Sequence, residues 1–215
     1  MARIGLLGGS FNPAHRGHRR ISLEALKRLG LDEVWWLVSP GNPLKEGAKD
    51  MAPFDVRFAA AQRLARRSRI RVSGFEQLSG TRYTIDTIKQ LKRHHPEHRF
   101  IWLLGSDTLP NFHFWREWRG LAREVAIAVI RRPGYDLAAH AARAMGWLRR
   151  FVHPSSHADK WTEWSLPAII FLRLPPDPSS ATAIRAQDPH WHRRLVFTRA
   201  ARAPSRPANV RQETP

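Results

Sequence analysis

Short apolar runs alternate along this chain with segments of helical periodicity, and this alternation limits the fold more than any other feature. Six runs have the length and character of buried strands, at residues 3–7, 33–38, 70–72, 100–104, 125–130 and 168–172. Between them, apolar residues recur at helical spacing, at 15–29, from 53 onward, at 84–93 and at 136–150. Strands that are apolar on both faces and alternate with helices indicate a parallel sheet covered on both sides. We therefore expect an α/β fold with a doubly wound parallel sheet.

The sequence also indicates how the chain is divided and where it resides. Residues 1–200 are predicted to form one domain, and residues 201–215, rich in Pro and Arg without periodicity, a disordered tail. No apolar run approaches the ~18 residues of a membrane span, and the first residues lack the features of a secretory leader. We expect a cytoplasmic protein.

The composition restricts the chemistry. The chain has no cysteine, which excludes disulfides, thiol catalysis and cysteine-bound zinc. Its net charge of +18 favours anionic partners. Small phosphorylated molecules suit this field at least as well as nucleic acid. A third reading is that the scattered arginines reflect only a bias in composition.

The loop after the first predicted strand carries the strongest local signal. Residues 8–18 read GGSFNPAHRGH, so two glycines let the backbone approach a phosphate closely before a helix begins. His15 and His18 share one face of the first helical turn, whose free N–H groups attract anions. Two imidazoles there can donate hydrogen bonds to a triphosphate. Surface histidines and half of a metal site are the competing interpretations, although no third ligand lies nearby.

Loops after later strands carry further candidates. Lys45 can reach phosphates, with a solvated surface lysine as the alternative. Asp107 can accept hydrogen bonds from a ribose or hold a metal-bound water, and Thr84 can bind a carboxylate; for both, a plain helix N-cap is the alternative. Trp115 offers an indole face to a flat ring, but most tryptophans belong to a core, and only its place in a motif described below singles it out.

A break rich in proline at residues 175–178 precedes a second helix start. Ser180 and Thr182 present hydroxyl groups there, and Arg185 lies one turn further on, where it can reach phosphate oxygens. An ordinary capped helix is the alternative.

Two of these segments resemble the signatures of the nucleotidyltransferase superfamily. Residues 9–18 resemble G-S-F-x-P-x-H-x-G-H, and residues 180–185, SATAIR, resemble S-S-T-x-I-R. Four more segments resemble bacterial nicotinate-nucleotide adenylyltransferases: NPLK at 42–45, YTIDT at 83–87, GSD at 105–107 with FHFW at 112–115, and RPGY at 132–135. The resemblance covers residues 3–187 and implies a Rossmann-like sheet of the nucleotidyltransferase type.

The resemblance implies an enzyme of NAD biosynthesis that joins ATP and nicotinate mononucleotide and releases pyrophosphate. Mg²⁺ would enter bound to ATP, with no metal ligand assigned to the protein. His18 would stabilise charge developing on the α-phosphate, while His15, Lys45 and Arg185 bind phosphates. The implied ATP-binding residues are Gly8, Gly9, Ser10, Phe11, His15, His18, Asp107, Ser180, Thr182 and Arg185. The implied nicotinate-nucleotide-binding residues are Asn42, Lys45, Thr84, Gly105, Asp107, Trp115 and Arg132.

Other readings stay open on the sequence alone. A sister enzyme could use phosphopantetheine or nicotinamide mononucleotide as the acceptor. A nucleic-acid-binding protein that uses the basic tail is the weaker alternative, and a homo-oligomer is a further partner to consider. Leu44 replaces the usual His of the N-P-H-K loop, and the chain after residue 187 departs from the family pattern.

Overall fold

The computed structural model describes residues 1–41, 50–131, 136–173, 177 and 179–193. Within this part of the chain, seven strands form one sheet in the order β3-β2-β1-β4-β5-β7-β6, and every strand pairing is parallel. The strands are β1 Arg3–Gly9, β2 Glu33–Val38, β3 Ile70–Ser73, β4 Arg99–Gly105, β5 Ala126–Arg131, β6 Val152–His153 and β7 Ile169–Arg173. The doubly wound parallel sheet is confirmed.

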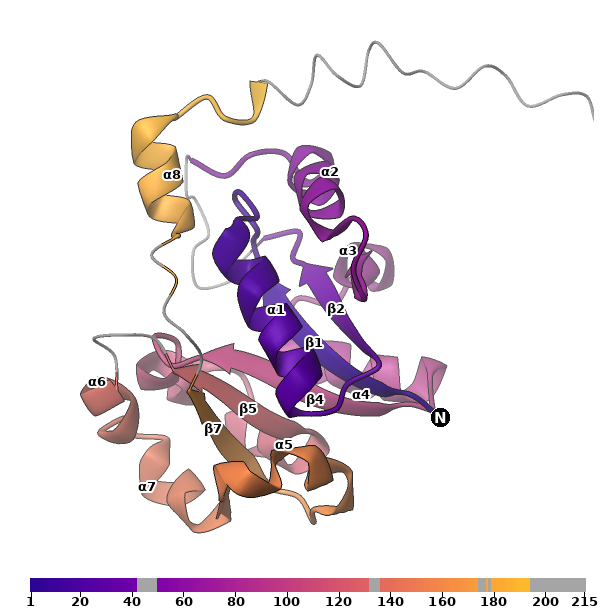
Figure 1. The fold of residues 1–215 in the computed structure, drawn as a ribbon, viewed down its shortest axis with the longest axis vertical. Helices are drawn as coiled ribbons and strands as arrows, with labels where there is room; N and C mark the ends of the chain where they lie inside the picture. The colour runs from indigo at the N-terminus through magenta and orange to yellow at the C-terminus, as the bar shows by residue number, and fades with distance from the viewer. Residues whose placement is uncertain (42–49, 132–135, 174–176, 178, 194–215) are drawn as a thin grey trace, which may run out of the picture.

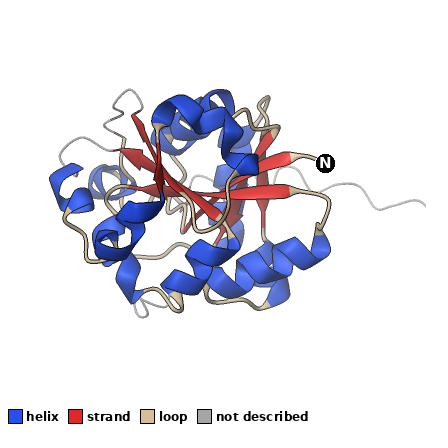
Figure 2. Cartoon of the chain, turned by 90° about the horizontal axis from the view of Figure 1, so that it is seen from below, coloured by secondary structure: helices blue, strands red, loops and turns tan. Residues whose placement is uncertain are grey.

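Helices cover both faces of this sheet (Figures 1 and 2). The α-helices are α1 Arg16–Arg28, α2 Phe54–Ala65, α3 Phe75–Ser79, α4 Thr84–His94, α5 Trp118–Glu124, α6 Asp136–His140, α7 Met145–Leu148 and α8 Ala181–Gln187. Three 3₁₀ segments accompany them: η2 Leu109–Phe114, η3 Arg149–Phe151 and η4 Ser155–Glu163. No helix in the described residues is both long and apolar enough to cross a membrane.

The core consists of two layers, one on each face of the sheet. One layer joins the sheet to α4, α5, α6 and α7, and the other joins it to α1, α2 and η4. Neighbouring residues of a strand point to opposite layers, as Trp35 and Trp36 of β2 show. This double burial explains why the strands are continuously apolar in sequence.

The order of the strands places a crevice between β1 and β4. The chain first adds β2 and β3 on one side of β1 and then returns to place β4 on the other side. Loops that leave β1 and β4 therefore diverge to opposite faces, because β1 leads to α1 and β4 leads to η2 and α5. Ligands of such sheets bind beyond the carboxyl ends of these two strands.

The prediction of one helix across residues 136–150 is wrong. The segment forms α6, a turn, α7 and η3 instead. Ala142 and Ala144 are both buried, at 7% and 0% exposure. Two residues apart, they would lie on nearly opposite sides of a continuous helix, so the break allows both to pack. The two-residue strand β6 that follows was also not predicted.

The segment after α8 is anchored by one tryptophan. Trp191 is 8% exposed and packs with Ala52 and Val56, at the start of α2. The unusual chain ending therefore contacts the fold at least as far as this residue. The predicted tail, residues 201–215, lies outside the described residues, so the prediction of its disorder stays a prediction.

Candidate active site

A cavity of about 320 Å³ lies at the carboxyl ends of β1 and β4. It is lined by the end of β1, by His18 of α1, by the start of α4 and by the loop after β4. Eight of the sequence-predicted site residues line it: Gly8, Gly9, Ser10, His18, Thr84, Gly105, Asp107 and Trp115. The structure thus brings together residues from four separate segments of the chain.

At Gly8 the backbone of β1 and the indole of Trp102 come into close contact in the wall of this cavity. A Cβ atom at Gly8 would lie 2.5 Å from Cη2 of Trp102, a residue of β4 that also lines the cavity. A Cβ at Gly9 would meet only an ordinary contact, 3.5 Å from Cε2 of Phe11. Gly8 is therefore required for the indole to reach the cavity.

His18 is held in one orientation by the start of its own helix. The backbone N–H of His15, the N-cap of α1, donates to Nδ1 of His18 over 3.2 Å. Because Nδ1 accepts this bond, the neutral imidazole carries its proton on Nε2. The ring also contacts Phe11 and Trp36, with centroids 4.8 and 6.1 Å away. His18 can therefore present an N–H donor to a ligand.

Two predicted ATP-site residues lie behind this wall rather than in it. Phe11 is 1% exposed and His15 is 7% exposed. The His15 ring lies 3.8 Å from that of His18, centroid to centroid, and neither His15 nor Phe11 is among the residues that line the cavity. Both rings contact the His18 ring from behind and so help to hold its position.

A buried arginine that the sequence analysis missed joins the loops at this end of the sheet. Arg57 of α2 is 1% exposed, and burial lowers its pKa. Its guanidinium donates to the carbonyl oxygens of Ser10 (2.6 Å), Ser39 (2.8 Å), Pro40 (3.1 Å) and Ala52 (2.8 Å). It thereby ties together the loops after β1 and β2 and the start of α2. The sequence did not single out Arg57, because it is one of many arginines in the chain and lies in an ordinary helix.

The residues predicted from the second signature lie beside the loop after β1. Arg185 donates from Nη1 to the carbonyl of Asn12 (2.7 Å) and from Nε to the carboxylate of Asp50 (2.8 Å). Ser180 caps α8, because its Oγ accepts a hydrogen bond from the N–H of Ala183. Thr182 is exposed, and none of the three signature residues lines the cavity.

The other half of the cavity is formed by α4 and the loop after β4. Thr84 is the first residue of α4 and not its N-cap, which is Tyr83; similarly, Thr108 and not Asp107 caps η2. The structure therefore places neither Thr84 nor Asp107 at the N-cap position. Each of these residues lines the cavity instead.

Aromatic rings surround this half. Trp115 lies against Trp102 and Phe112, with ring centroids 6.3 and 5.3 Å apart. Trp118 packs against Phe112 and Trp147 and does not line the cavity. The structure therefore distinguishes two tryptophans that share one loop in the sequence.

Charged side chains complete this half of the cavity, and the sequence analysis did not single them out. Glu76 lines the cavity together with Arg82 and Arg116. Burial raises the pKa of Glu76 to about 7, against a hydrogen bond from the hydroxyl of Thr87 that lowers it. The guanidinium of Arg116 lies over the ring of Tyr83, 4.7 Å from its centroid. Near neutral pH this wall holds two cations and one group that titrates.

Three predicted site residues lie outside the described residues: Asn42, Lys45 and Arg132. Their assignment stays a prediction.

Comparisons with known proteins agree with this geometry. The model of the cytidylyltransferase-like family matches residues 6–187. A relative from Erythrobacter litoralis named "Probable nicotinate-nucleotide adenylyltransferase" is 54% identical over 189 residues, which cover 88% of this chain and 86% of the relative. A relative of the same name from Methylorubrum extorquens is 47% identical over 185 residues, covering 86% and 100% of the two chains.

A solved structure shows the same fold at lower sequence similarity. The nicotinic acid mononucleotide adenylyltransferase of Plasmodium falciparum, complexed with NaAD, superposes with a TM-score of 0.64 at 20% identity. The match covers 86% of this chain and 83% of that one.

Proposed function

The chain belongs to the cytidylyltransferase-like family and, within it, to the nicotinate-nucleotide adenylyltransferases, and from this premise we propose its reaction. It transfers the adenylyl group of ATP to nicotinate mononucleotide, forming nicotinate adenine dinucleotide and pyrophosphate. An oxygen of the acceptor's 5′-phosphate bonds to the α-phosphorus. The bond from that phosphorus to the oxygen bridging to the β-phosphate breaks, and pyrophosphate leaves with the electron pair.

We propose that the phosphate half of the cavity stabilises this displacement. The glycines that end β1 let phosphates approach the backbone, and Nε2–H of His18 donates to an oxygen of the α-phosphate. Little covalent chemistry is asked of the protein, because positioning and charge stabilisation supply most of the acceleration in such reactions. Ser180, Thr182, Arg185 and Lys45 are proposed to hold the triphosphate, as the signatures imply.

The other half is proposed to hold the nicotinate nucleotide. Trp115 offers its indole to the pyridine ring, and Thr84 supplies a hydroxyl and a backbone N–H at the start of α4 for the carboxylate. Arg82 and Arg116 make this end favourable for an anion.

The carboxylate of Asp107 fits a Mg²⁺ ion that arrives with ATP. Asp107 lines the cavity, and in the described part of the chain no group of three histidine or acidic side chains converges there. Such a site suits an ion that keeps phosphate oxygens and waters as its ligands. We propose that Asp107 holds one of these waters. When bound, such an ion would neutralise charge on the triphosphate.

The observation that carries the proposal is the meeting of His18 and Trp115 in one cavity from segments about half the chain apart. The experiment is to measure pyrophosphate release from ATP and Mg²⁺ with nicotinate mononucleotide, with phosphopantetheine and without an acceptor. We expect pyrophosphate release only when nicotinate mononucleotide is the acceptor. Mass spectrometry should then identify the dinucleotide product. Release with phosphopantetheine, or none from folded protein, would contradict the proposal.

A further inference from the structure

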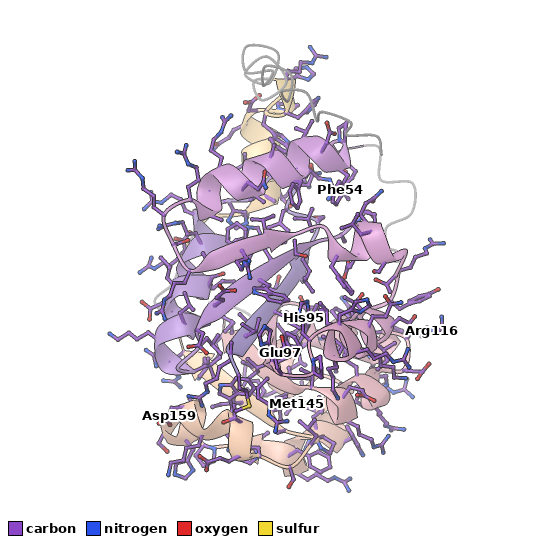
Figure 3. All side chains as sticks on the ribbon, turned by 90° about the vertical axis from the view of Figure 1, so that its right-hand side faces the viewer. Phe54, His95, Glu97, Arg116, Met145 and Asp159 are labelled. Atoms are coloured by element: carbon purple, nitrogen blue, oxygen red, sulfur yellow. The ribbon has the colours of Figure 1, made fainter. Side chains whose placement is uncertain are left out.

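Three side chains that could bind a metal converge at the far end of the sheet from the cavity. His95 ends α4 as its C-cap, and Glu97 and His98 follow before β4 begins. The turn is closed by a backbone hydrogen bond from His98 N–H to the carbonyl of His95, 3.1 Å long. Figure 3 shows His95 and Glu97 side by side, away from Arg116 at the cavity. The turn thus presents three donor side chains within four residues.

The donor atoms of these residues are close to the separations that a metal requires. Oε1 of Glu97 lies 3.3 Å from Nε2 of His98 and 3.7 Å from Nδ1 of His95. One potential ligand atom from each of the three residues lies within 4.8 Å of the others. Ligands about 2.0–2.2 Å from a tetrahedral Zn²⁺ ion are separated by about 3.3–3.6 Å. Small side-chain rotations would therefore bring all three donors to one ion.

The packing of the rings leaves one nitrogen of His98 for a ligand. Both imidazoles stand edge-on to Trp35, with centroids 5.2 Å (His95) and 6.0 Å (His98) from the indole. Nδ1 of His98 is buried without a hydrogen-bond partner in the described structure. Nε2 is the nitrogen that faces Glu97. The ligating side of the cluster remains accessible, since the Glu97 side chain is 53% exposed.

We propose that His95, Glu97 and His98 form a binding site for a late first-row divalent metal ion of the Zn²⁺ class. Two imidazoles and one carboxylate are the donor set that such ions prefer, and a water would complete a tetrahedron. The site also lies at the carboxyl end of α4, where the helix dipole favours a cation. The bound ion would cross-link the end of α4 to the start of β4. It takes no part in the adenylyl transfer.

Zn²⁺ alone is the probe for this site. The 215-residue chain, without an affinity tag, is treated with a chelator and dialysed against Zn²⁺, and the bound metal is then measured per chain. We expect one Zn²⁺ per chain, with affinity reduced at least about tenfold in His95→Ala and in His98→Ala. Glu97→Gln also weakens binding. His94→Ala is the matched control, because His94 is adjacent in sequence and bonds to the carbonyl of Gln90 instead.

A spectroscopic signal locates the metal independently. Co²⁺, which replaces Zn²⁺ in such sites and quenches nearby indoles, is expected to quench the emission of Trp35. Part of the drop in tryptophan emission on adding Co²⁺ should be lost in Trp35→Phe, and this part is assigned to Trp35. His98→Ala should abolish the same part of the quenching. Pyrophosphate release is measured on the same variants and stays within twofold of the unmodified chain.

The outcomes are separable from those of the proposed reaction. No bound Zn²⁺, or Zn²⁺ bound as tightly by His98→Ala as by the unmodified chain, would overturn the metal site. The carboxylate of Glu97 would then serve only as a close polar neighbour of the two imidazoles. Failure of adenylyl transfer in the unmodified chain would leave the metal result unaffected.

Discussion

The two halves of the cavity are built in different ways. The phosphate half is shaped by backbone: the glycines of β1, the hydrogen bond that orients His18, and loops held by the buried Arg57. The ring half is shaped by side chains such as Trp115 and Glu76, which are only partly buried. The difference teaches that changes in the first half should damage turnover or folding, whereas changes in the second should alter affinity for one substrate.

The largest effect is expected at His18. His18→Ala removes the donor to the developing charge and should lower kcat by about 10²–10³-fold, with unchanged folding by circular dichroism. His18→Gln should recover part of the loss and His18→Asn less, because the Gln amide reaches the Nε2 position. Equal rates for Ala and Gln would mean that Nε2–H is not the active group.

Arg57 is expected to control stability rather than chemistry. Arg57→Met leaves one buried and three partly buried carbonyls without their donor and should cost about 3 kcal/mol of unfolding free energy. For a chain of this size the melting temperature should fall by about 6–12 °C in calorimetry. Arg63→Met, on the exposed side of the same helix, is the control and should change little. A similar loss in both variants would refute the specific role of Arg57.

Gly8 connects the two halves, because its space is occupied by Trp102 of the ring half. Gly8→Ala should force the indole to move and cost about 1–3 kcal/mol, read as a lower melting temperature. Gly9→Ala is the control for stability, since its Cβ has an ordinary contact distance. Equal stability of the two variants would contradict the close approach.

Trp115 should act on one substrate only. Trp115→Ala removes the stacking surface, worth about 1 kcal/mol, and should raise KM for nicotinate mononucleotide by about fivefold. The KM for ATP of Trp115→Ala should change little. A Trp115→Phe variant, which keeps an aromatic ring, should have nearly the same melting temperature as the unmodified chain. An increase confined to the KM for ATP would show that Trp115 does not bind the nicotinate ring.

The smallest effect is expected from the titration of Glu76. Its pKa of about 7 lies above the ordinary value of 4.5, so the carboxyl is neutral below pH 7 and charged above it. As pH rises from 6 to 8, the new charge should repel the anionic acceptor and raise its KM. Glu76→Gln should remove this rise. A pH profile unaltered by the substitution would exclude Glu76 as its source.

The same shift affects stability, and its sign follows from proton binding. Between pH 4.5 and about 7 the folded state holds a proton that the unfolded state has lost. Stability therefore falls as pH rises through this window. In Glu76→Gln this part of the pH dependence should disappear from denaturation curves.

The sequence predicted most of the sheet because its strands are buried on both faces and read as apolar runs. It singled out His18 from the glycine-rich end of a strand and Trp115 from the motif resemblance alone, and both residues line the cavity, while their roles stay predictions. It could not predict the break after His140, which depends on where Ala142 and Ala144 find space. Nor could it separate Arg57 from the surface arginines, because three of its four partners come from loops 17 to 47 residues away in the sequence.

The most direct test of two separable halves is the ratio of kcat/KM for nicotinate over nicotinamide mononucleotide, in the unmodified chain and in His18→Ala. Arg82 and Arg116 in the ring half favour the carboxylate, so the account predicts a preference of about tenfold or more for nicotinate. His18→Ala should lower both rates and leave the ratio within about twofold, because the α-phosphate donor is common to both reactions. No preference in the unmodified chain, or a ratio that collapses in His18→Ala, would contradict the account.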